Sequence, residues 1–305
     1  MEAIVEFGSH ISGGVTKYSD KDLLVVCSAD KKRSYQREYT TKGYSVSFYS
    51  PSQLEHMRLK GALFLQHLKL ESNIIRDVGR DFERFINSCD AILPTSEELE
   101  RCRASIEEAI LSPASKLLNG WFSDYLYVLS RDYFVKYFAT QGRLIFNANK
   151  LISAIREEFN LSEDSASAIL ELRKNKSIYR NNIPQLNKDN SALMQWINVL
   201  SYALRFDSRT PYSEHYYLNK VSFNEFSSTY DLLRYVESLL ILFPEVSCGN
   251  KRDSLIKKLI TNPNNYCATS RSGKVTLDNY LIDFMAEANK GLQWTAKRNA
   301  TFVSN

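Results

Sequence analysis

The sequence predicts an α+β fold in which a small α/β unit precedes a much larger helical region. Two short apolar runs, 4–7 and 23–26, flank a stretch rich in Gly and Ser. A third run, 44–49, alternates strictly between two kinds of side chain, as strands do. Beyond residue 95, almost every segment has helical periodicity. The segment 91–96 is the expected linker, which divides the chain into domains 1–94 and 95–305.

The expected strands differ in how far they are buried. Ile4–Phe7 and Leu23–Val26 are almost entirely apolar, which is typical of strands covered on both faces. In Tyr44–Tyr49 (YSVSFY), large side chains alternate with Ser45 and Ser47. The two serines are therefore expected on one face of the third strand.

A helix is expected directly after the third strand. Pro51 precedes Ser52, and Glu55 follows three residues later, which is the spacing of a capping box. An apolar stripe then predicts packing against the sheet. Its members are Leu54, Met57, Phe64, Leu65 and Leu68.

The remaining chain predicts helices separated by prolines, by Gly142 and by the NPNN run at 262–265. Sustained alternation is absent from this part of the sequence, so a second sheet is not expected. The expected helices lie near 96–111, 114–138, 143–159, 163–176, 190–206, 225–242, 251–260 and 276–290.

Composition indicates an ordinary globular protein, with 44% hydrophobic and 24% charged residues in a chain of 305. An apolar run of the length that spans a bilayer is absent, and the N-terminus lacks the features of a signal peptide. The five cysteines form no CxxC pair and predict reduced thiols, neither a zinc site nor a disulfide framework. We expect a cytoplasmic protein without a membrane partner. The net charge of +4 permits contact with nucleic acid.

The residues that point to a reaction lie between the first two strands. Gly8-Ser9 ends the first strand, and a small turn lets backbone N–H groups approach a phosphate. Asp20 and Asp22 open the second strand and are one residue apart, so both face the same side. Paired carboxylates with substrate phosphates hold Mg²⁺, or Mn²⁺. This pattern predicts a site for a nucleoside triphosphate (NTP) and metal, with both aspartates catalytic.

The spacing also carries a family resemblance. It consists of Gly8-Ser9, Gly13, Ser19-Asp20 and Asp22. This order resembles the signature of the DNA-polymerase-β-like nucleotidyltransferase superfamily, in its minimal bacterial branch. The resemblance implies an enzyme that transfers a nucleoside monophosphate from an NTP to an acceptor hydroxyl. It also implies that Gly8, Ser9 and Ser19 bind the nucleotide, while the two aspartates bind the metal.

Two further segments resemble this branch and the helical domains that accompany it. The segment 63–77 ends a helix with His-Leu-Lys-x-Glu and leads into a short strand at 73–75. The segment 121–152 resembles the HEPN group of helical bundles, whose ribonucleases carry an Arg-x4–6-His motif. Arg131 is present here, but no His follows at that spacing, so ribonuclease activity is not expected. We expect the many aromatic residues of this segment to form a helical core.

The sequence departs from the superfamily pattern in its third strand. Enzymes of this kind usually carry a third carboxylate there, whereas this chain offers Ser45 and Ser47. Glu38, Glu71 and Asp77 are the candidate substitutes. The departure leaves two hypotheses open, an active transferase and a nucleotide-binding regulatory or interaction module that no longer catalyses transfer.

Basic residues supply candidate contacts with the acceptor or its phosphates. One set is Lys31, Lys32 and Arg33 in the stretch 31–42, and another is Arg173, Lys176 and Arg180. Each stretch is either a phosphate-binding track or a solvated segment. With the large helical region, they favour a macromolecular acceptor, either tRNA or other RNA or a partner protein, in a toxin–antitoxin or defence setting. Transfer to a small antibiotic-like molecule is a further alternative.

Overall fold

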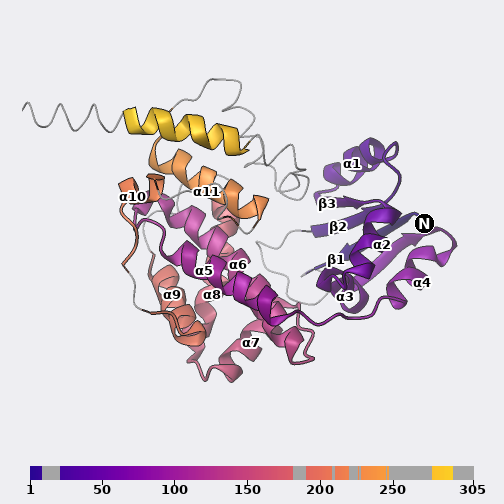
Figure 1. Cartoon of the computed structure of the whole chain (residues 1–305). Helices are drawn as coiled ribbons and strands as arrows, with labels where there is room; N and C mark the ends of the chain where they lie inside the picture. The colour runs from indigo at the N-terminus through magenta and orange to yellow at the C-terminus, as the bar shows by residue number, and fades with distance from the viewer. Residues whose placement is uncertain are drawn as a thin grey trace, which may run out of the picture. The chain divides into compact units, whose positions relative to one another are not determined.

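The computed structural model describes residues 1–8, 21–180, 190–207, 210–219, 226, 228–244, 246 and 277–290. A four-stranded sheet near the N-terminus is followed by helices, which confirms the predicted α+β class (Figure 1). The residues group into two compact units. The first contains Met1–Cys102 and Ser130–Ser167, and the second contains Arg103–Leu129 and Ala168–Asn305. The domain boundary after residue 94 remains a prediction.

The sheet has the order β3-β2-β1-β4. β1 is antiparallel to both β2 and β4, whereas β2 and β3 are parallel. The three predicted strands at 4–7, 23–26 and 44–49 are confirmed, and the short strand at 73–75 is longer than expected. The strands are β1 Ala3–Phe7, β2 Lys21–Val26, β3 Tyr44–Tyr49 and β4 Ser72–Asp77.

Both faces of this sheet carry apolar clusters, as the apolar runs predict. Alternate residues of a strand point to opposite faces, so Leu24 and Val26 join one cluster while Leu23 and Val25 join the other. The first face packs against α2 (Pro51–Leu59), α3 (Leu63–Leu70) and α4 (Asp81–Asn87). The second packs against tyrosines of α1 (Lys32–Thr41). We call the first of these the α3 face.

Residues Lys32–Thr41 of the basic stretch form helix α1, to which the sequence assigned no secondary structure. The first turn of α2 differs from expectation. The capping box of α2 consists of Ser50 and Gln53, not Ser52 and Glu55. Ser50 is extended, and Pro51 occupies the first helical position, where its missing N–H costs nothing. Ser52 therefore already lies inside the first turn.

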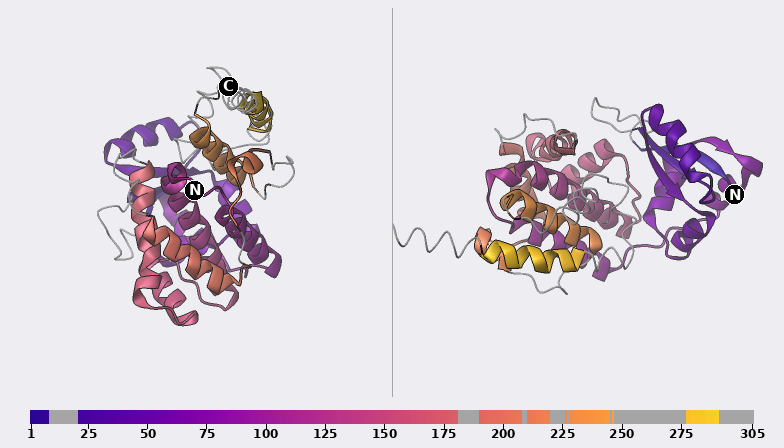
Figure 2. Two further views of the ribbon diagram at one scale, coloured as in Figure 1. Left: turned by 90° about the vertical axis from the view of Figure 1, so that its left-hand side faces the viewer. Right: turned by 90° about the horizontal axis from the view of Figure 1, so that it is seen from above.

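The helical part of the chain matches the predicted segments closely (Figure 2). Helix α10 (Glu214–Asn219) was not expected, and α6 (Asn119–Thr140) begins only after a short 3-10 turn η2 (Lys116–Leu118). The expected helix 251–260 lies outside the described residues. No strand follows β4 within the ranges that the structure describes. The helices are α5 Ser96–Ile110, α6 Asn119–Thr140, α7 Ala148–Glu158, α8 Glu163–Arg180, α9 Ser191–Leu204, α10 Glu214–Asn219, α11 Thr229–Leu242 and residues 277–290.

Aromatic side chains form much of the helical core, as expected. Phe134 and Phe138 are fully buried in the first unit, and Trp121 and Trp196 are fully buried in the second. Large aromatic rings contribute much of the burial that stabilises such bundles. Each helix in the described ranges is too short or too polar to span a lipid bilayer.

The turn between α2 and α3 requires a glycine. Gly61 has φ +61°, and a Cβ added there would lie 2.1 Å from Cβ of Ile92. We expect Gly61→Ala to lower the free energy of unfolding by about 2 kcal/mol or more, because it combines left-handed strain with a steric overlap. The measurement is urea unfolding followed by circular dichroism.

Gly43→Ala is the matched control for this prediction. Gly43 has φ +80°, but a Cβ there meets no atom within 4 Å. Gly43→Ala should lower the free energy of unfolding by about 1 kcal/mol, which is the cost of the left-handed backbone strain alone. Equal losses for the two variants would contradict the steric argument at Gly61.

Candidate active site at one end of the sheet

One row of paired residues crosses the sheet at its candidate site. Phe7 of β1 pairs with Asp22 of β2 and with Ser72 of β4, and Asp22 pairs with Ser45 of β3. Directly paired residues point to the same face, and Phe7 packs on the α3 face. Asp22 therefore also faces α3. Twice the usual strand spacing places Cα of Asp22 and Cα of Ser72 about 10 Å apart.

Gly8 and Asp22 lie together at this end. Gly8 has φ +84°, a conformation that favours glycine, and a Cβ added to it would lie 2.9 Å from Oδ2 of Asp22. The bare backbone thus leaves room beside a carboxylate. That arrangement fits Mg²⁺ bound with a nucleotide, since Mg²⁺ takes carboxylate and phosphate oxygens.

Other parts of the predicted nucleotide site lie outside the described residues, namely Ser9, Ser19 and Asp20. In the part of the chain that the structure describes, no group of three or more His, Cys, Asp or Glu side chains is arranged to hold a metal ion. Gly8 and Asp22 are the two predicted site residues that the structure brings together.

The third strand has serines where a carboxylate was sought. Ser45 lies next to Asp22, and Ser47 pairs with Leu24, one row further along the same face. This placement confirms the expected orientation of both serines. A hydroxyl is a weak Mg²⁺ ligand, so any third acid comes from elsewhere in the chain.

Two of the three candidate substitutes lie elsewhere. Asp77 pairs with Ala3 at the opposite end of the sheet, and its carboxylate accepts N–H bonds from Phe82 and Glu83 of α4. Glu38 belongs to α1, on the other face, and forms an exposed ion pair with Lys42 at 2.8 Å. Neither is placed beside Asp22.

Glu71 is the candidate at the correct end and on the correct face. It directly precedes Ser72, the partner of Phe7, and it ends α3. Its Oε2 lies 3.4 Å from Nε2 of His67, and its Oε1 accepts the backbone N–H of Asn147 at 3.1 Å. Both side chains are largely buried, with 11% of His67 and 16% of Glu71 exposed.

Aromatic rings hold His67 in place. Phe146 stacks on the imidazole with ring centroids 4.9 Å apart, and Phe7 meets it edge-on at 5.9 Å. Burial acts to raise the pKa of the Glu71 carboxyl, but the hydrogen bond and charge of His67, together with the N–H of Asn147, lower that pKa below its usual value. Glu71 is therefore a carboxylate at neutral pH.

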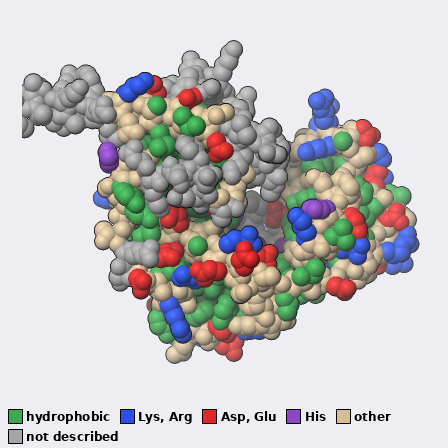
Figure 3. Space-filling view, in the orientation of Figure 1, with side chains coloured by type: hydrophobic (Ala, Val, Ile, Leu, Met, Phe, Trp, Pro, Cys, Tyr) green, Lys and Arg blue, Asp and Glu red, His purple; other side chains and the backbone are tan. Residues whose placement is uncertain are grey.

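The basic residues near β2 lie at the other end of the sheet. Lys31, Lys32 and Arg33 come after the end of β2, about 13 Å along the strand from Asp22. Nζ of Lys31 forms a 2.6 Å ion pair with Glu2, and Lys32 lies over the ring of Phe48. Figure 3 shows Lys and Arg side chains interspersed with Asp and Glu over the visible face. The structure does not bring this basic set to the Asp22 end.

The second basic set lies on α8. Arg180 donates from Nε to both carboxylate oxygens of Asp124, at 3.1 and 3.0 Å. Nζ of Lys176 lies 5.2 Å from the ring centroid of Tyr127. Arg173 is on the same helix and is partly exposed. Arg180 therefore has a structural role in addition to any contact with phosphate.

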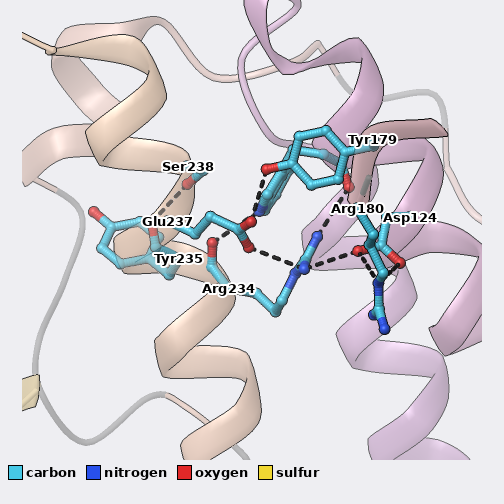
Figure 4. Close-up of polar contacts among 8 residues, drawn as sticks. Asp124, Tyr179, Arg180, Arg234, Tyr235, Glu237 and Ser238 are labelled. Atoms are coloured by element: carbon cyan, nitrogen blue, oxygen red, sulfur yellow. Dashed lines mark hydrogen bonds and ion pairs between the residues drawn. The ribbon is translucent and has the colours of Figure 1, made fainter. Parts of the chain in front are cut away.

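The carboxylate that holds Arg180 belongs to a buried polar cluster that sequence analysis missed (Figure 4). Nη1 of Arg234 lies 3.0 Å from Asp124 and 2.9 Å from Glu237, and the hydroxyl of Tyr179 donates to Glu237 at 2.7 Å. Burial raises the pKa of Glu237, although Arg234 opposes that shift. The signal was present in the sequence, because Asp124, Arg234 and Glu237 interrupt runs of apolar helical residues.

We expect Arg234→Met to lower the free energy of unfolding by about 3–5 kcal/mol, because it removes the buried cation from Glu237 and leaves Asp124 paired with Arg180 alone. Only 1% of the Arg234 side chain is exposed. Thermal and urea unfolding measure the effect.

Lys290→Met is the control in the same unit, since Lys290 pairs with Glu287 at 2.8 Å but is 71% exposed. Lys290→Met should change the free energy of unfolding by no more than about 0.5 kcal/mol. A loss of similar size at Arg234 would mean that the buried cluster contributes little to stability.

Comparison of the chain with protein-family models, with curated proteins and with solved structures finds no match.

Proposed function

We propose that this chain is a metal-dependent nucleotidyltransferase of the DNA-polymerase-β-like superfamily. It transfers a nucleoside monophosphate from an NTP to an acceptor hydroxyl, with RNA, tRNA or a partner protein as the favoured acceptor. The proposal includes a helical, HEPN-like domain over 95–305 that binds the acceptor.

One observation carries the proposal. The Asp22 carboxylate reaches over the left-handed Gly8 backbone at the end of a central strand. A side chain at position 8 would occupy the space beside that carboxylate. The arrangement supports a nucleotide site because it combines an approachable backbone with a hard oxygen donor.

Each residue has a distinct role in the proposed reaction. Gly8, Ser9 and Ser19 bind the nucleotide, and Asp20 with Asp22 holds Mg²⁺ or Mn²⁺. The bound metal supplies positive charge that stabilises the attacking and leaving oxygens. The chain itself orients the NTP so that its α-phosphorus faces the acceptor hydroxyl.

A second candidate is a nucleotide-binding regulatory or interaction module. Ser45 favours it, since this hydroxyl lies beside Asp22 where an acid is usual. Such a module binds NTP and metal without transfer. A small antibiotic-like acceptor remains a variant of the enzyme proposal.

We expect Asp22→Asn to reduce transfer of label by about 100-fold or more, because metal-held charge contributes several kcal/mol to transition-state stabilisation. The assay incubates purified full-length protein with each labelled NTP, Mg²⁺ or Mn²⁺, and either total tRNA or lysate. Asp90→Asn, an exposed aspartate outside the row, is the control that should retain activity.

Thermal unfolding in EDTA separates this effect from misfolding. Asp22→Asn should not lower the midpoint, because clustered carboxylates without metal repel each other. Binding of NTP by calorimetry with no transfer to any acceptor would favour the regulatory module. Transfer that persists in Asp22→Asn would contradict both the site and the proposal.

A further inference from the structure

We infer that the His67–Glu71 pair replaces the missing third carboxylate, with His67 accepting the proton of the acceptor hydroxyl and Glu71 orienting the imidazole. This inference rests on the proposed function and adds a catalytic residue and a positioning residue to it.

Position within the sheet selects this pair. Glu71 adjoins Ser72, which shares a row with Phe7 and Asp22. The hydroxyl of Ser72 donates to the backbone oxygen of Leu68, so this row faces α3, the helix that carries His67. Asp77 is excluded because it lies at the opposite end of the sheet, and Glu38 is excluded because its helix, α1, covers the other face.

The environment of His67 suits a proton acceptor. Imidazole is the side chain that most readily exchanges a proton near neutral pH. A carboxylate bound at one ring nitrogen orients the ring so that the other nitrogen can accept a proton. Glu71 contacts Nε2 at 3.4 Å, and the stacked Phe146 and edge-on Phe7 restrict rotation of the ring. The Glu71 carboxylate is held in turn by the N–H of Asn147.

The proton transfer completes a balanced reaction. The acceptor oxygen forms a bond to the α-phosphorus while its O–H bond breaks, and the proton passes to the imidazole nitrogen that does not face Glu71. The bond between the α-phosphorus and the bridging oxygen breaks, and pyrophosphate leaves with that electron pair. The imidazolium is stabilised by Glu71 and later returns its proton to water.

The same contacts also join α3 to the start of α7. Asn147 is the N-cap of α7, where its side chain accepts the N–H groups of Asn149 and Lys150. Removing either member of the pair could therefore loosen this junction as well as remove a base. The test needs readouts that a structural role would not change.

The first readout is chemical rescue of His67→Ala. This variant leaves a ring-sized space between Phe7 and Phe146. We expect its kcat to fall about 100-fold, in the range that general-base catalysis contributes. Added imidazole should raise the kcat of His67→Ala at least tenfold. Pyrrole, which has the same ring size but no basic nitrogen, should leave this kcat unchanged.

The second readout separates binding from turnover in Glu71→Gln. Its kcat should fall while KM for the NTP and the affinity for NTP with Mn²⁺, measured by calorimetry, stay within about twofold of wild type, because the pair does not hold the nucleotide. Thermal midpoints of both variants are recorded alongside. Asp22→Asn, in contrast, should lose both affinity and turnover.

Two results would overturn the inference while leaving the proposed function intact. One is turnover unchanged in both variants under conditions where Asp22→Asn is inactive. The other is equal rescue by imidazole and pyrrole, which would assign His67 a packing role. Absence of transfer by the wild-type protein with every NTP and acceptor would instead contradict the proposed function itself.

Discussion

The register of β1 is the constraint on which the candidate site depends. β1 lies between β2 and β4, and its last residue, Phe7, pairs with both Asp22 and Ser72. Because side chains alternate between faces, a slip of one residue would turn Asp22 away from α3. The apolar residues of β1 and β2 prevent that slip, since each face must bury its own set against different helices. Core packing therefore determines where the carboxylate points.

Charged groups are buried in both compact units, but their surroundings differ. In the first unit, His67 and Glu71 lie at the Asp22 end of the sheet, and aromatic rings pack against His67. In the second, Arg234 lies between Asp124 and Glu237, and these charges are almost completely removed from water. Full burial demands that every charge be paired, and these pairs join Asp124 of α6 to Arg234 of α11, which also pairs with Glu237. In the first unit, 11% of the His67 side chain and 16% of the Glu71 side chain are exposed, so this pair keeps a small contact with solvent.

The serines of β3 mean that the proposed reaction must take its third acidic group from another element. Ser45 lies where a carboxylate would neighbour Asp22, and this removes one negative charge from the row. In the proposed reaction, Glu71 at the C-cap of α3 acts through His67 in place of that carboxylate.

The sequence by itself determined the class of fold, the strands at 4–7, 23–26 and 44–49 and most of the helices in the described ranges. Apolar periodicity and the residues that end helices and strands act locally, so the folded chain keeps the elements that they predict. It also determined that Gly8 and Asp22 belong together and that Ser45 and Ser47 share a face. Only the tertiary structure decided which of Glu38, Glu71 and Asp77 shares the end and the face of the sheet with Asp22, because that choice depends on strand order and on the helix covering each face. Tertiary structure likewise paired Lys31 with Glu2 and joined Arg180 to Asp124, because contacts between residues distant in the chain are set by packing and leave no spacing pattern in the sequence.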